Sequence, residues 1–99
     1  MTDQETNRKL ALAIGWEPEQ IKPNGSSIFV RHCGLWCVFN YRHWHTIGPI
    51  AQRYDCFPRK NGSKWQGYVG HVCIMQFADT PQKAIALAVI ATHGSGVLE

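Results

Sequence analysis

The pattern of apolar and polar positions predicts a first helix near the start of the chain. Thr2 and Glu5 have the spacing of a capping box, in which each side chain satisfies a backbone N–H group of the other residue. Leu10 and Ile14 lie four positions apart and therefore share one helical face. Gly15 followed by Trp16 is a typical helix end. We expect a helix over about residues 3–14.

Two further segments have helical spacing. In the second helix Thr46 is the expected cap, Pro49 is tolerated in the first turn, and Pro58 ends the segment. Its apolar face comprises Ile47, Ile50, Ala51 and Tyr54. The third helix begins at Asp79-Thr80-Pro81, a cap followed by proline at the first helical position, and ends at Gly94. Its apolar face comprises Ala84, Ile85, Ala88, Val89 and Thr92.

The segments between these helices are rich in β-branched and aromatic residues and predict strands. Residues 27–31 and 35–41 are expected to form a hairpin through a tight connection at 32–34. Residues 64–77 are expected to form one long strand or two, preceded by a turn at Asn61-Gly62. The predicted order is α-β-β-α-β(-β)-α, with no internal repeat.

The predicted strands carry apolar side chains on both faces. Along 35–41, Cys37 and Phe39 alternate with Trp36 and Val38, and residues 72–77 have the same character. A sheet with one face in water usually alternates apolar and polar residues. We therefore expect an α+β fold in which a mostly antiparallel sheet of three to four strands is covered on both faces by the three helices, as a three-layer α/β/α sandwich.

Composition indicates one folded domain. The chain has 99 residues, of which 44% are hydrophobic and 17% are charged, and these values are typical of a globular protein. We expect a single domain over 1–94 and a flexible tail over 95–99, part of which could derive from cloning. The longest apolar run is too short to span a membrane, so we expect a cytoplasmic protein without membrane contact. In the cytoplasm its four cysteines are expected to remain thiols.

Several segments together resemble the small phage and prophage proteins that carry the phage ABA sandwich domain. These are residues 40–44, the helix at 47–54, the strand that begins with Trp65, and Ala78-Asp79-Thr80-Pro81-x-x-Ala84-Ile85, with the N-terminal helix that ends at Gly15-Trp16. The resemblance spans most of the chain. It implies the sandwich fold and a phage or prophage origin in a bacterial host. It implies no catalytic residues.

A mixed basic and aromatic cluster is the candidate binding site. Arg42, His43, Trp44 and His45 are consecutive, and Arg59, Lys60 and Lys64 belong to the same basic middle third of the chain. Trp44 could seat a partner or act as a lid over the core, with the cations as a solvated rim. We expect an accessory protein without enzymatic activity that binds a macromolecule, a protein in preference to a nucleic acid. The net charge of +3 is low for a dedicated DNA-binding protein.

A zinc-dependent or thiol-dependent enzyme built on Cys33, Cys37, His43 and His45 is the alternative. The spacing C-x3-C followed by H-x-H matches no common zinc pattern, and an extended strand would separate the two cysteines by about 13 Å. Cys37 and Cys73 lie in apolar runs and are interpreted as core residues, whereas His43 and His45 are expected at the surface. We expect no metal, no cofactor and no catalytic residue. An unpaired sheet edge or the apolar flank of the last helix could support a dimer.

Overall fold

The computed structural model describes residues 1–69 and 75–93. The helices are α1 (Asp3–Ala13), α2 (Trp44–Arg53) and α3 (Pro81–His93), with a short 3-10 helix, η1 (Pro18–Gln20). The strands before α2 are β1 (Ile21–Asn24), β2 (Ser27–His32) and β3 (Leu35–Phe39). The strands after it are β4 (Arg59–Asn61), β5 (Lys64–Gly67) and β6 (Gln76–Ala78).

Local capping explains where α1 and α3 begin. The Thr2 hydroxyl accepts the backbone N–H of Glu5, and the Glu5 carboxylate accepts the backbone N–H of Thr2, which completes the predicted capping box. The Thr80 hydroxyl accepts the N–H of Lys83 at the start of α3. The first and third predicted helices are therefore confirmed, as α1 and α3. The second helix begins earlier than predicted, with His43 rather than Thr46 at the cap position, and Pro49 lies inside it.

The first sheet is an antiparallel meander in the order β1-β2-β3. Val30 lies opposite Ile21 on one side and Cys37 on the other, whereas Phe29 lies opposite Lys22 and Val38. A turn at 24–27 joins β1 to β2, with Gly25 at φ 61°. The turn from β2 to β3 has positive φ at both central residues, Cys33 (52°) and Gly34 (79°), which matches the right-handed twist of the paired strands.

The second sheet is also antiparallel, in the order β4-β5-β6. The predicted Asn61-Gly62 turn joins β4 to β5, with Gly62 at φ 67°. The predicted strand at 64–77 is present as β5 and β6, and the part of this prediction that covers 70–74 lies outside the described residues. The predicted tail at 95–99 lies outside them as well.

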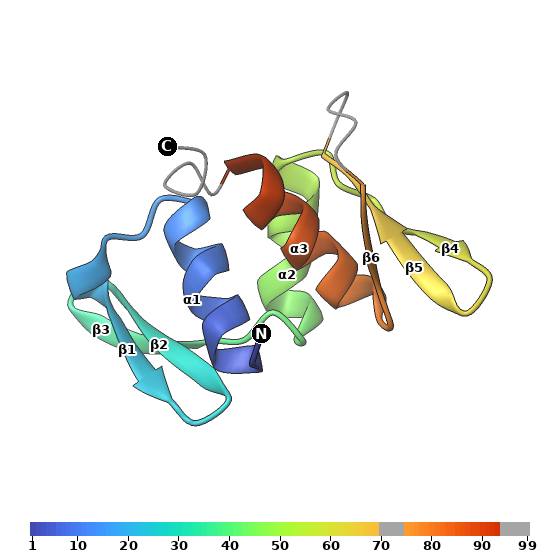
Figure 1. Ribbon diagram of the computed structural model, residues 1–99. Coiled ribbons are helices and arrows are strands. Elements are labelled where there is room, and N and C mark those ends of the chain that lie inside the picture. Colours follow the sequence, from blue (N-terminus) through green and yellow to red (C-terminus); the bar gives the residue numbers. More distant parts are fainter. Residues whose placement is uncertain (70–74, 94–99) are drawn as a thin grey trace.

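The three helices lie between the two sheets (Figure 1). Helix α1 packs against β1 and β2, α3 packs against β5 and β6, and α1 and α3 pack against each other. The fully buried side chains of Leu10, Ile85 and Val89 belong to the shared core, and Ile28, Val30 and Phe39 extend this core under the first sheet. The first sheet therefore contributes strand residues to this core, whereas the second sheet packs on α3 and none of its strand residues belongs to the buried cluster.

The α+β class is confirmed, but the strands form two sheets rather than one. The prediction that strand 35–41 is covered on both faces is wrong. Trp36 is 38% exposed, Val38 is 50% exposed, and Cys37, interpreted as core, is also exposed. The physical reason is that α1 covers only the inner face of this sheet and lies over β1 and β2, so that β3 extends beyond it at the edge.

Two short strands, β1 and β4, were not predicted. Strand β1 has only four residues and includes Pro23, and β4 has three residues, all polar and exposed. Neither has the apolar run that identifies a strand in a sequence. Their pairing with β2 and β5 holds them in place.

Candidate binding surface

The predicted cluster at 42–45 lies where β3 leads into α2. Arg42 is engaged in a structural contact: its Nε donates to Asp3 Oδ2 at 2.7 Å and its Nη2 donates to Asp3 Oδ1 at 3.0 Å. The hydroxyl of Tyr41 donates to the same carboxylate at 2.7 Å. Arg42 thus joins the start of α1 to the start of α2, and its charge is already neutralised by a partner within the chain.

The Asp3–Tyr41–Arg42 cluster alters the acidity of its members. The hydrogen bond from Arg42, followed by that from Tyr41, lowers the pKa of Asp3 below its ordinary value. Burial, together with the hydrogen bond to Asp3, raises the pKa of Tyr41 to about 12. The cluster is therefore a carboxylate held ionised by a cation and a neutral phenol, an arrangement that stabilises the fold.

The other three predicted residues lie at the surface. Trp44 is the first residue of α2 and is 54% exposed, and the ring centroids of His43 and His45 lie 5.2 Å apart. The basic residues at 59, 60 and 64 belong to the β4–β5 hairpin, which extends away from the start of α2 (Figure 1). The structure therefore does not combine the hairpin cations with Trp44. The involvement of residues 42–45 in binding stays a prediction.

The described cysteines differ in their exposure, and only Cys33 and Cys37 belong to the alternative enzyme. Cys33 lies in the β2–β3 turn and Cys37 in β3, both exposed, whereas Cys56 is buried. Burial raises the pKa of the Cys56 thiol to about 11, so this group stays protonated and unreactive near neutral pH. Within residues 1–69 and 75–93, no group of three or more His, Cys, Asp and Glu side chains has an arrangement that could hold a metal. Cys73 lies outside those ranges.

The structure instead reveals a basic and aromatic surface on the first sheet. Side chains directly opposite each other in an antiparallel pair share a face, and alternate residues share a face along each strand. By this register the face turned away from α1 carries five large side chains. We call them the sheet patch: Lys22, Phe29, Arg31, Trp36 and Val38.

Cations lie over the aromatic rings of the sheet patch. The Nζ atom of Lys22 is 4.3 Å from the ring centroid of Trp36 and 5.5 Å from that of Phe29. Arg31 lies directly opposite Trp36 in the next strand. The remaining strand residues on this face are Asn24 and Ser27, so that its three strands contribute two positive charges and no acidic side chain. The sheet patch therefore has its apolar side chains on β2 and the edge strand β3 and its cations on β1 and β2.

The outward face of the second sheet differs in charge. There Arg59, Gln66 and Phe77 lie in one row across the strands. Lys64 is paired with Asp79 at an N–O distance of 2.8 Å, so one of the two cations on this side has an acidic partner. The sheet patch differs from this surface in having two cations without an ion pair among the described residues and two aromatic rings beside them.

Sequence reasoning assigned Trp36 and Val38 to the core, because an apolar residue on an uncovered face has the same pattern as one on a covered face. A signal was nevertheless present. Along 27–31 the polar residues Ser27 and Arg31 share one face with Phe29, whereas the other face carries only Ile28 and Val30. Because Arg31 lies opposite Trp36 and Phe29 lies opposite Val38, both β3 residues lie on this more polar face. The sequence does not give this pairing register.

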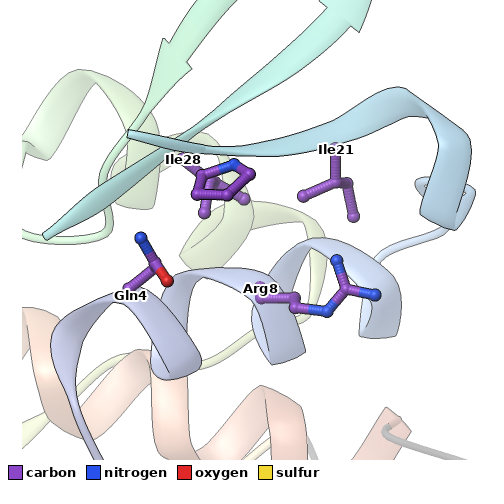
Figure 2. A pocket seen from close by; sticks show the side chains of 5 residues that line it. Gln4, Arg8, Ile21 and Ile28 are labelled. Atoms are coloured by element: carbon purple, nitrogen blue, oxygen red, sulfur yellow. The ribbon is translucent and has the colours of Figure 1, made fainter. Parts of the chain in front are cut away.

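A small cleft lies on the opposite, inner side of the same sheet. Figure 2 shows Gln4 and Arg8 of α1 facing Ile21 and Ile28, and Pro23 completes the lining. Its volume is about 40 Å³, enough for a few water molecules. Pockets for small-molecule ligands are roughly ten times larger. The cleft is therefore a packing gap between α1 and the sheet rather than a substrate site.

Comparisons with protein-family models, with curated proteins and with solved structures found no match for this chain. The resemblance to the phage ABA sandwich family therefore stays a prediction. Among the described residues, no helix is both long enough and apolar enough to cross a membrane.

Proposed function

We propose that the protein is a binding module without enzymatic activity, and that the sheet patch is its site for another protein. One observation supports this proposal: Phe29, Trp36 and Val38 lie together on a sheet face that none of the described helices covers. Lys22 and Arg31 lie beside them, and the strand residues of that face include no acid. An exposed aromatic and aliphatic surface next to charged residues is typical of a protein-binding surface. The complementary partner presents an apolar surface flanked by carboxylates.

A protein fits this surface better than a nucleic acid does. A base would stack on an aromatic face, but the Lys22 ammonium lies 4.3 Å from the Trp36 ring centroid. The half-exposed side chain of Val38 contributes apolar area that phosphates and sugars do not use, whereas a protein side chain does. We retain the phage or prophage origin and the cytoplasmic location indicated by the sequence as parts of the proposal, which place the partner in a bacterial cell.

Capture from a nuclease-treated bacterial lysate tests the site. Wild-type protein and two charge-matched variants are immobilised: Lys22→Glu in the sheet patch and Lys9→Glu on the exposed side of α1. We expect Lys22→Glu to lose a protein that wild type and Lys9→Glu retain. The retained protein is then purified and its affinity measured with Trp36→Ala, which we expect to weaken binding by about tenfold or more.

Retention of the same proteins by Lys22→Glu would refute the proposed site. Binding of a single-stranded oligothymidylate, followed by fluorescence anisotropy over a range of salt concentrations, tests the nucleic-acid alternative. Phosphate contacts release counterions, so a nucleic-acid site loses affinity steeply with salt. Tight binding of this oligonucleotide with a steep salt dependence, abolished by Lys22→Glu, would replace the protein partner with a nucleic acid.

A further inference from the structure

Strand β3 has an unusual free edge. Strand order places β2 on one side of β3 and, among the described residues, no strand on the other. Its sequence is Leu-Trp-Cys-Val-Phe, and the first four of these residues are exposed. Edge strands are usually protected from further pairing by charged residues, proline or a bulge. Leu35–Phe39 contains no charge and no proline, and its pairing with β2 is continuous.

The hairpin turn determines which backbone groups point to the free edge. In a two-residue turn of this type the flanking residues, here His32 and Leu35, form a hydrogen-bonded pair. Hydrogen-bonded and non-hydrogen-bonded pairs then alternate along an antiparallel ladder. Leu35, Cys37 and Phe39 therefore direct their N–H and C=O groups toward β2. Trp36 and Val38 direct theirs outward.

The outward groups are complementary to those of an identical strand. We propose that two copies of the protein pair antiparallel through the free edges of β3, with the two-fold axis at Cys37. In this register Trp36 lies opposite the partner's Val38, and Leu35 lies opposite the partner's Phe39. All five residues pair, no like charges meet, and an aromatic residue faces a β-branched residue, which is a favourable cross-strand pair.

The dimer would also join the two sheet patches. Residues opposite each other share a face, so Trp36 of one copy and the partner's Val38 lie on the side that carries Lys22 and Phe29. The result is a six-stranded sheet with one continuous basic and aromatic surface. This inference does not depend on the proposed function, because edge pairing uses backbone groups whether or not another protein binds the sheet patch.

Cys37 provides a variant that separates the two proposals. Its side chain lies on the inner side of the edge strand and is not part of the sheet patch. Cys37→Lys would place two ammonium groups next to each other at the two-fold axis, since Cα atoms of a non-hydrogen-bonded pair are about 4.5 Å apart. Cys37→Ser leaves the axis neutral. Both variants keep Lys22, Phe29, Arg31, Trp36 and Val38.

Sedimentation equilibrium with a reductant present measures the association. From about 10 to 500 µM, a range suited to a small interface, we expect the average mass of wild type and Cys37→Ser to rise from 11.2 kDa toward twice this value. Cys37→Lys should remain monomeric, with a dissociation constant at least about tenfold higher. A wild type that stays at 11.2 kDa, or a Cys37→Lys variant that associates equally, would overturn the proposal. Circular dichroism confirms that each variant is folded.

Disulfide formation tests the register. Cα atoms about 4.5 Å apart lie within the range that a disulfide spans, so Cys37 should link to the partner's Cys37 when the protein is oxidised with copper phenanthroline. The test variant is Cys33→Ser/Cys73→Ser, and the matched control is Cys37→Ser/Cys73→Ser. In the proposed register the two Cys33 residues are roughly 26 Å apart and should not link. Equal linking through Cys33 would rule out this register.

Discussion

Asp3 connects two parts of the chain that are far apart in sequence. Its carboxylate accepts hydrogen bonds from Tyr41 and Arg42, which lie 38 and 39 positions away. Next to it in space, the buried side chain of Asn7 accepts the backbone N–H of Tyr41 at 2.7 Å and donates to the carbonyl of Ser26. One side of α1 is thus attached by polar contacts to the loop before α2 and to the β1–β2 turn.

Replacing Asp3 with asparagine should lower the free energy of unfolding by about 1–2 kcal/mol at pH 7, because a carboxylate accepts stronger hydrogen bonds from a cation than an amide does. The folded pKa of Asp3 is lower than its ordinary value of 3.8, so the carboxylate stabilises the fold above that value. This stabilisation is lost as the pH falls toward the folded pKa.

Urea unfolding at pH 7 and at pH 3 measures this difference. We expect the difference in the free energy of unfolding between wild type and Asp3→Asn to be smaller at pH 3 than at pH 7. Glu19→Gln, at an exposed position of η1, is the control and should change stability little at either pH. A gap of the same size at both pH values would contradict the assignment of the effect to the charge on Asp3.

At the scale of elements, the contact between β5 and α3 depends on a glycine. A Cβ atom at Gly67 would lie 2.7 Å from the backbone carbonyl oxygen of Ala84, closer than such atoms approach in proteins. Gly67 is buried, and its strand therefore lies directly against the helix backbone. This close approach positions the second sheet on the central helices.

Gly67→Ala should destabilise the protein by about 1–3 kcal/mol, because the strand or the helix must move to admit a methyl group. The matched control is Gly48→Ala inside α2, where a Cβ atom would meet nothing within 4 Å. Alanine has the higher helix propensity, so this control should be neutral or should gain about 0.5–1 kcal/mol. Thermal unfolding compares the two variants, and equal effects would contradict the close approach of β5 to α3.

The helix boundaries and hairpin turns are the parts of the fold that the sequence predicts best. The boundaries of α1 and α3 were predicted because the capping groups that define them are within three or four residues, as with Thr2 and Glu5. The tight connection at 32–34 and the turn at Asn61-Gly62 were predicted for the same reason. The start of α2 was not predicted correctly, because no side chain at its cap position makes a capping hydrogen bond.

At the scale of the whole molecule, two sheets are joined through the packing of α1 and α3. Each sheet is small, so neither could bury enough apolar area by itself: the first contributes strand residues to the shared core, and the second packs on α3. Leu10 of α1 and Val89 of α3 are fully buried in the shared cluster. Removal of either side chain should therefore affect both sheets together.

Leu10→Ala should lower the free energy of unfolding by about 2–5 kcal/mol. Fluorescence of Trp36 reports on the first sheet and that of Trp65 on the second, so single-tryptophan variants can follow each sheet separately. We expect the same unfolding midpoint for both reporters before and after the substitution. If the substitution lowered the unfolding midpoint reported by Trp36 but not that reported by Trp65, the two sheets would unfold independently.

The sequence by itself determined the helices, the turns and the α+β class, because caps, glycines at positive φ and apolar periodicity act over a few residues. Only the tertiary structure decided that the strands form two sheets and that one face of the first sheet meets water. An apolar side chain on a strand looks the same in sequence whether a helix covers it or not. The sheet patch and the edge of β3 depend on register and on the placement of α1, both of which arise from contacts between residues distant in the chain.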